Sequence, residues 1–507
     1  MRLSPTRGRW LALLSLTGFY YVIPNARIDF SRFNAHDSEA YLALSYGLVH
    51  GLGYTRSMVP GQYLPHRWWP PGMPVLMAPA VALSGLPVNW LILKLTVATI
   101  GILGVVLAWI LTKRLTGDDR AADIAALLLG LNVWYWDFSH QVMAEVPVTV
   151  WVIGSLLLID RVWAARRLRL TEAVAVGVCC GVGMLIKAHA IGLLIAPLAY
   201  LAGPRRVARP KIFVAACCVL FALGFLLPSA LWAARNQRIP AGGPDSFTQL
   251  EGIRHRNTMD PDSPTLTLTE TAGVVVFNLR MYVIYNIPSQ VLPGLWSQST
   301  LQWRGSGTLA LILTAVVGLL CWPRARLYSL HLAVVPMALI NLIFVSGGAG
   351  RYWLPVSSLL LLIVAMRLAE LFKSVQPTFR YSALAVGLLV ANLCLYVYQH
   401  ERAPYDPDGP WRELAELFEK IRVANLSPVI GVLGPHSQAL QLSTGLPAPI
   451  TDGAVYDHVV RRTDGPGAQP PDDAVPVVEL KPWALFKLAR PMTIEGDAYA
   501  SGLRKSK

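Results

Sequence analysis

The sequence contains 507 residues, of which 54% are hydrophobic and only 15% are charged. About a quarter of the residues of a typical soluble domain are charged, so this composition excludes an ordinary soluble protein and predicts a polytopic membrane protein. The net charge of +14 does not indicate nucleic-acid binding. Most Lys and Arg residues lie in short runs between hydrophobic segments, and the sequence has no zinc-type cysteine spacing or recognition-helix pattern.

The hydrophobic segments predict eleven transmembrane helices, each close to the length of about 20 apolar residues that a bilayer requires. The first follows three arginines and has no convincing cleavage site, so we interpret it as a retained signal anchor. Segment 73–88 is apolar but rich in proline, which favours a re-entrant or interfacial helix over a span. The predicted spans are 10–26, 90–111, 121–138, 143–160, 172–187, 189–203, 212–233, 307–322, 328–346, 352–370 and 381–399.

The distribution of positive charge predicts the orientation of these spans. Cytoplasmic loops of membrane proteins carry an excess of Lys and Arg. In this chain the N-terminus and every second loop after it have that excess. The N-terminus is therefore expected inside and the C-terminal segment outside. The short loops on the outer side carry almost no cations, and Lys187 and Arg351 are the exceptions.

Two domains follow from this topology. Residues 1–399 are predicted to form an all-α transmembrane domain with outer loops 27–89 and 234–306. The first loop is expected to contain an amphipathic helix over 38–50, and the second a helix on the membrane surface over 274–296. Residues 400–507 have the composition of a small soluble domain and predict an extracytoplasmic α/β lobe with a helix over 411–422 and a strand over 428–433.

Unusual polar residues gather at the outer membrane face of this topology. Charges at the edge of the hydrocarbon are costly, and those that face a cavity are commonly functional. Because Lys187 and Arg351 oppose the positive-inside bias, we expect them to bind an anionic ligand. The alternatives are structural: Asp37 or Glu145 as helix-capping charges, the cations as interfacial anchors, and the histidines as hydrogen-bonded core residues. The residues are His36, Asp37, Glu39, Asp137, His140, Glu145, Lys187, His189, Arg235, Asn236, Arg351 and Tyr352.

Carboxylates and cations on one aqueous side suit the transfer of a group from a lipid phosphate. Cationic side chains would hold the phosphate and stabilise the leaving oxygen, and a carboxylate would take the proton of the acceptor. Asp37 is the predicted general base, with Glu39 and Glu145 as further catalytic candidates. No cofactor is predicted with certainty, and a divalent metal on Asp37, Glu145 and His140 remains an alternative if they converge. The predicted substrate- or phosphate-binding residues are Lys187, His189, Arg235, Arg351 and Tyr352.

Four motifs in order along the chain resemble those of a known family, the multi-spanning glycosyltransferases of the GT-C fold. The bacterial branch similar to protein O-mannosyltransferases and to the lipid A aminoarabinose transferase resembles the chain most in these motifs. They are Asp37-Ser38-Glu39-Ala40-Tyr41 followed by Pro70-Pro71-Gly72-Met73-Pro74, then Met143-Ala144-Glu145, Trp232-Ala233-Ala234-Arg235-Asn236, and Gly350-Arg351-Tyr352-Trp353-Leu354-Pro355. The chain departs from the mannosyltransferase pattern in separating its two acids by Ser38.

The resemblance implies a hexosyl- or pentosyltransferase that uses a polyprenyl-phosphate-linked sugar and inverts the anomeric carbon. It also implies a bacterial inner membrane protein whose active site faces the periplasm, with a lipid, glycan or protein as acceptor. By the same resemblance, Asp37 would be the catalytic acid of the loop motif. Two other functions stay open: a flippase or transporter of lipid-linked oligosaccharides, and a polymerase or ligase of surface polysaccharide. The absence of an internal repeat and the charges at one membrane face weigh against a transporter.

Overall fold

The computed structural model describes residues 37–55, 65–85, 88–164, 168–202, 210–239, 263–291, 306–323, 328–344 and 350–371, strands between 430 and 493, and a few single positions. Almost all of the predicted first span 10–26 lies outside the described residues, as do the last span 381–399, the helix predicted over 411–422, and His36.

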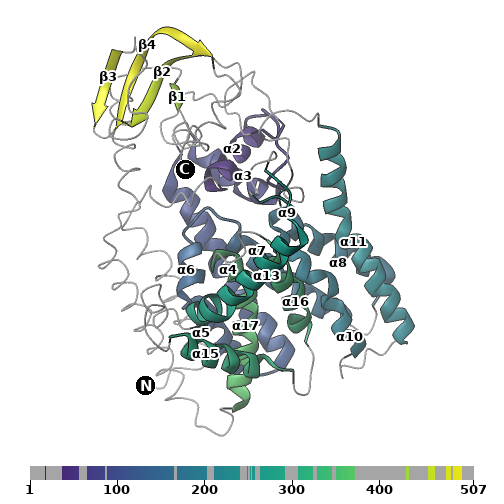
Figure 1. Ribbon diagram of the computed structural model, residues 1–507. Coiled ribbons are helices and arrows are strands. Elements are labelled where there is room, and N and C mark those ends of the chain that lie inside the picture. The colour runs from purple at the N-terminus through teal and green to yellow at the C-terminus, as the bar shows by residue number, and fades with distance from the viewer. Residues whose placement is uncertain are drawn as a thin grey trace, which may run out of the picture.

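The described part is mainly helical, and its long helices run side by side through the bundle in Figure 1. In chain order the helices are α2 (Asp37–Val49), α3 (Gly72–Ser84), α4 (Trp90–Thr116), α5 (Asp119–Gly130), α6 (Val133–Phe138), α7 (Glu145–Trp163), α8 (Leu170–Gly181), α9 (Gly183–Ile186), the 3₁₀ helix η2 (Ala188–Leu198), α10 (Ala199–Ala202), α11 (Lys211–Gln237), α13 (Leu268–Met281), the π-helical turn η3 (Tyr282–Asn286), α14 (Ile287–Val291), α15 (Ser306–Cys321), α16 (Ser329–Ile343) and α17 (Gly350–Leu371).

Four helices among the described residues are long and apolar enough to cross a membrane, namely α4, α7, α11 and α17. The ends of α4 carry the expected signals. The Asn89 side chain accepts hydrogen bonds from two backbone amides at the start of α4, and Gly117 ends the same helix with a φ of 72°. Other predicted spans are shorter or broken, so the count of eleven stays a prediction. The proline-rich α3 has only 13 residues, too few to cross a bilayer.

Close backbone packing brings the helices around the site together. A Cβ added to Gly72 at the start of α3 would lie 2.5 Å from the carbonyl of Leu185, so α3 packs directly against the end of α9. The Ser45 hydroxyl of α2 donates to the backbone carbonyl of Pro74 at 2.9 Å, which ties α2 to α3. As a result, α2 and α3 lie near Lys187, the extended residue between α9 and η2. In Figure 1, α13 crosses the bundle obliquely.

A four-stranded mixed sheet lies in the C-terminal part of the chain. Its strands are β1 (Ile430–Val432), β2 (Val455–Arg462), β3 (Val475–Leu480) and β4 (Trp483–Thr493), in the order β1-β2-β4-β3. β1 pairs with β2 in parallel, and the other pairs are antiparallel. β1 falls within the strand predicted over 428–433. The sheet, yellow in Figure 1, lies at the end of the molecule where α2 lies. The extracytoplasmic position of a C-terminal lobe stays a prediction.

Candidate active site

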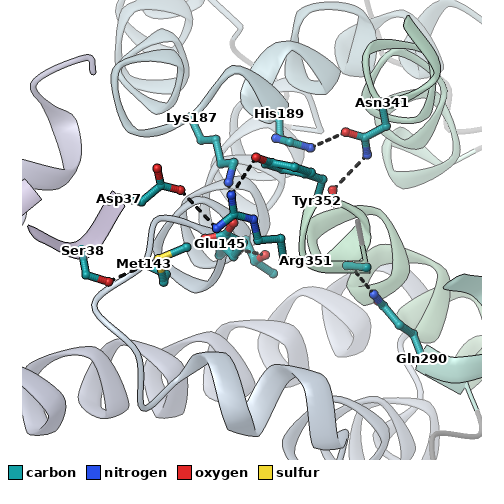
Figure 2. Close-up of polar contacts among 12 residues, drawn as sticks. Asp37, Ser38, Met143, Glu145, Lys187, His189, Gln290, Asn341, Arg351 and Tyr352 are labelled. Carbon is teal, nitrogen blue, oxygen red and sulfur yellow. Dashed lines mark hydrogen bonds and ion pairs between the residues drawn. The ribbon is translucent and has the colours of Figure 1, made fainter. Parts of the chain in front are cut away.

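Two ion pairs bring together four of the predicted site residues (Figure 2). Arg351 Nη1 lies 3.2 Å from Asp37 Oδ2, and Lys187 Nζ lies 2.6 Å from Glu145 Oε1. We call these four residues the charge cluster. They come from segments far apart in the sequence, and the cluster contains two carboxylates and two cations. It is therefore electrically neutral when all four side chains are ionised.

Each charge of the cluster lies at the end of a helix. Asp37 and Glu145 are the first residues of α2 and α7, where the helix dipole favours negative charge. Lys187 lies in extended backbone between α9 and η2. Arg351 is the second residue of α17. The polar groups are thus presented at helix ends and not within the apolar bodies of the helices.

Tyr352 contacts both cations of the cluster. The Lys187 Nζ is 4.7 Å and the Arg351 Cζ 4.8 Å from the centroid of its ring, distances at which a cation is attracted to the ring face. Arg351 Nη2 also donates to the Tyr352 hydroxyl at 2.8 Å. One aromatic side chain therefore contacts both positive charges of the cluster.

A buried network of His189, Asn341 and Asn278 supports Tyr352. Its ring stacks on His189, with a centroid distance of 6.4 Å and an interplanar angle of 6°. His189 Nε2 shares a hydrogen bond of 2.7 Å with Asn341 Oδ1, and the Asn341 amide donates to the Tyr352 carbonyl at 2.9 Å. The Asn278 amide in turn donates to three carbonyls at the end of α16. His189 is therefore hydrogen-bonded and stacked on Tyr352, and a role in binding substrate or phosphate stays a prediction.

Burial sets the protonation behaviour of Asp37. Its side chain is only 13% exposed, and this desolvation raises the pKa of the carboxyl above its ordinary value. The charges of Arg351 and Lys187 and a hydrogen bond from the Trp69 side chain oppose the shift without cancelling it. Burial also raises the pKa of Tyr41 well above its ordinary value, so this phenol stays neutral. A carboxylate with a raised pKa is a stronger proton acceptor than an exposed aspartate.

Several other predicted residues lie outside the charge cluster. Glu39 is buried on α2 and takes no part in the two ion pairs. His140 Nδ1 shares a hydrogen bond of 2.7 Å with the carbonyl of Trp136, and Asp137 accepts one from Gln141. Among the described residues, no three His, Cys, Asp or Glu side chains form a group that could hold a metal ion. Asp37, Glu145 and His140 therefore do not converge as a metal site would require.

Arg235 contacts the first outer loop. Its Nη1 donates to the carbonyl of His66 at 2.5 Å and to Asn236 Oδ1 at 2.8 Å. Its guanidinium also lies over the rings of Tyr54 and Trp232, at 5.4 and 4.7 Å from their centroids. A role of Arg235 toward the lipid phosphate stays a prediction.

Three residues that shape the site were not predicted as site residues from the sequence. Tyr41 lies four residues after Asp37 on the same helix, a spacing that puts both on one face. Trp69 closes the first outer loop, and its side chain reaches Asp37. Asn341 lies within a predicted span, where a polar side chain is expensive and usually has a partner or a function. That rule was the available signal for Asn341, while no pattern in the sequence pointed to Trp69.

Comparison with known proteins finds one matching family model, over part of the chain, and solved structures with a similar fold. Residues 69–232 match the family model described as dolichyl-phosphate-mannose-protein mannosyltransferase. The structure of ArnT from Cupriavidus metallidurans bound to undecaprenyl phosphate matches with a TM-score of 0.59 at 14% identity, over 95% of this chain and 98% of that one. The chain has the GT-C fold. The apo form of the same ArnT matches over the same shares with a TM-score of 0.54 and 14% identity.

The GT-C fold and the family match confirm the predicted resemblance to mannosyltransferases and ArnT. Together with the long apolar helices they identify a multi-pass membrane protein. The archaeal oligosaccharyltransferase AglB from Archaeoglobus fulgidus, in complex with an inhibitory peptide and a dolichol-phosphate, is less similar, with a TM-score of 0.48 at 14% identity over 88% of this chain and 65% of that one. A search of curated proteins finds no significant match.

Proposed function

We propose that this protein is a glycosyltransferase that moves a sugar from a polyprenyl-phosphate carrier to an acceptor at the periplasmic face of a bacterial inner membrane. The observation that carries the proposal is the charge cluster, in which a buried carboxylate of raised pKa lies beside two cations. Such a site combines a proton acceptor with groups that bind an anionic leaving group. The family match over residues 69–232 supports the same chemistry.

Asp37 is the proposed general base. It accepts the proton of the acceptor hydroxyl or amine while that atom attacks the anomeric carbon of the donor sugar. The new bond forms as the bond between the anomeric carbon and the phosphate oxygen breaks, and the polyprenyl phosphate leaves with the electron pair. Attack from the side opposite the phosphate inverts the anomeric carbon. Loss of a positioned general base typically reduces the rate by about 10²–10⁴-fold.

Arg351 and Lys187 are the proposed phosphate ligands. Each contributes several N–H donors, of which the carboxylates of the cluster use only part. Glu145 keeps Lys187 in position, and the Tyr352 ring contacts both cations. His189 stacks on the Tyr352 ring and supports it. Glu39, buried on α2, has no assigned step in this scheme.

The carrier is proposed to be a polyprenyl phosphate for two reasons. The chain covers 98% of an ArnT structure that holds undecaprenyl phosphate, so the folds correspond over nearly their whole length. The charge cluster also lies at the ends of helices that pass through the apolar body of the protein, where a lipid phosphate at the membrane surface would meet it. A transporter would instead be expected to hold its charges near mid-membrane on interrupted helices.

Transfer of radiolabelled sugar from a panel of polyprenyl-phosphate donors to membrane and cell-wall extracts tests the proposal. Asp37→Asn keeps the shape of the side chain and removes the base, so the purified variant should transfer label about 10²–10⁴-fold more slowly than the wild type. Asp119→Asn is the matched control, because Asp119 pairs with Lys113 at 2.8 Å and both side chains are nearly half exposed. The control should transfer like the wild type.

The other outcomes distinguish the alternatives. Equal transfer by Asp37→Asn and the wild type would show that Asp37 is only a helix-terminal charge. If the wild type transfers no label but moves lipid-linked sugar across vesicles, the protein is a transporter. If the label appears in a growing polysaccharide, the acceptor is a glycan and the enzyme acts as a polymerase or ligase.

A further inference from the structure

The end of α11 forms hydrogen bonds with residues 66 and 67 of the first outer loop. Arg235 Nη1 donates to the carbonyl of His66, and Arg67 Nε donates to the carbonyl of Asn236 at 2.9 Å. The Asn236 amide donates back to the carbonyl of Arg67 at 3.3 Å. These reciprocal contacts join two segments that are distant in the sequence. We call Arg235, Asn236, His66 and Arg67 the loop clasp.

The clasp continues into Trp69. The His66 ring stacks on the Trp69 ring with a centroid distance of 5.2 Å and an angle of 17°, and His66 Nε2 accepts a hydrogen bond of 2.9 Å from the Trp69 amide. Tyr54, whose ring lies under the Arg235 guanidinium, donates from its hydroxyl to the Trp69 carbonyl at 2.7 Å. The backbone and the ring of Trp69 are thus both fixed by residues that contact Arg235.

Trp69 in turn contacts the helix of the proposed base. Its ring meets the ring of Tyr41 edge to face, at 6.4 Å and 82°. Tyr41 lies one turn after Asp37 on α2, and both Trp69 and Tyr41 are buried. The Trp69 side chain also lies close enough to the Asp37 carboxyl to lower its pKa, against the larger effect of burial. The contacts therefore lead without interruption from Arg235 to Asp37.

We propose that Arg235 is a positioning residue, which holds the Pro65–Trp69 segment so that Trp69 orients Asp37. This inference rests on the proposed function for its effect on catalysis, but the positioning itself is a property of the fold. It gives Arg235 a role different from phosphate binding. Its Nη1 is engaged by two acceptors of the protein itself, and two aromatic rings flank its guanidinium.

Two kinds of variant test the inference in the purified full-length protein. Arg235→Gln removes the clasp cation, and Trp69→Phe keeps an aromatic ring but removes the indole N–H. Arg238→Gln is the matched control, because Arg238 lies one turn further along the same helix end and is exposed. Arg235→Lys keeps the charge and tests whether a shorter cation restores the contact. Thermal unfolding of each variant shows which of them are folded.

The decisive readout is the titration of Asp37, measured as the pH dependence of its carbodiimide labelling by mass spectrometry. Arg235→Gln and Trp69→Phe should both move the labelling midpoint upward by about one pH unit, the size of one charge-assisted hydrogen bond. The double variant should shift it no further than either single one, and Arg238→Gln should leave it unchanged. If Arg235→Gln does not fold, the shift of Trp69→Phe and the partial shift of Arg235→Lys carry the test.

Binding of polyprenyl phosphate separates this role from the alternative one. A positioning residue leaves the Kd for polyprenyl phosphate within about twofold of the wild type and lowers kcat for transfer. If Arg235→Gln weakens lipid binding tenfold or more while the Asp37 midpoint stays unchanged, Arg235 is a phosphate ligand and the inference is overturned. If Arg235→Gln shifts the Asp37 midpoint but the wild type transfers no sugar from any donor, the proposed function is refuted and the positioning role of Arg235 stands.

Discussion

Breaking the Lys187–Glu145 ion pair should destabilise the protein more from one side than from the other. Lys187→Met leaves a carboxylate that is 0% exposed, whereas Glu145→Gln leaves an ammonium that is 15% exposed and lies 4.7 Å from the centroid of the Tyr352 ring. An uncompensated buried charge costs about 3–5 kcal/mol. The Gln oxygen in Glu145→Gln can still accept a hydrogen bond from Lys187, so we expect a loss of about 1–2 kcal/mol there.

Denaturing-detergent titration of the full chain in micelles, followed by tryptophan fluorescence, measures these losses. The double variant Lys187→Met/Glu145→Gln should recover part of the loss of Lys187→Met, because it removes the stranded carboxylate. Lys113→Met is the control, since Lys113 pairs with the half-exposed Asp119 and such pairs contribute at most about 1 kcal/mol. Equal losses in the two single variants, or a loss near that of the control for Lys187→Met, would refute the argument that burial decides the cost.

Three further expectations follow from the same structure. Because the pKa of Asp37 is raised in the folded state, the ionised carboxylate opposes folding at neutral pH, and this cost is lost as the pH falls through that pKa. Asp37→Asn should therefore be at least as stable as the wild type at pH 7, although it lacks the base. Thermal unfolding measures this, and a less stable variant would contradict the sign of the argument. Gly72→Ala puts a Cβ 2.5 Å from backbone atoms of α9 and should cost about 1–3 kcal/mol in detergent titration, whereas Gly273→Ala, with nothing within 4 Å, should be neutral or stabilising by up to about 1 kcal/mol. Asn341→Ala removes hydrogen bonds to His189 and to a backbone carbonyl, so stability should fall by about 1–3 kcal/mol together with transfer activity; an unchanged kcat would mean that this network does not support the site.

The long apolar helices were predictable from the sequence to within a few residues. α4, α7 and α17 begin within two residues of the predicted spans, because continuous apolar runs bounded by polar residues leave little freedom. The interruptions were not predictable. The break after α5 depends on Asn132, whose amide donates to the carbonyl of Gln290 in a distant helix, and the 3₁₀ geometry of η2 has no local sequence signal.

The charges of the site were predictable one at a time, but their pairing was not. Asp37, Glu145, Lys187 and Arg351 each stood out because a charge at the membrane edge needs a reason. From their positions in the sequence, the two cations were expected to bind an external anion, and in the structure each also pairs with a carboxylate of the protein. Which cation meets which acid depends on how four helix ends converge, and hydropathy and charge sign carry no information about that convergence.

The electrical neutrality of the charge cluster bears on the order of events in the proposed reaction. A phosphodiester that binds Arg351 and Lys187 adds one negative charge to a cluster that had none in sum, and a nearby negative charge makes a carboxylate a stronger proton acceptor. Arg351 would at the same time divide its hydrogen bonds between the phosphate and Asp37, which weakens the interaction that most lowers the basicity of Asp37. Donor binding would therefore activate the base, and an acceptor arriving first would meet Asp37 still engaged with Arg351.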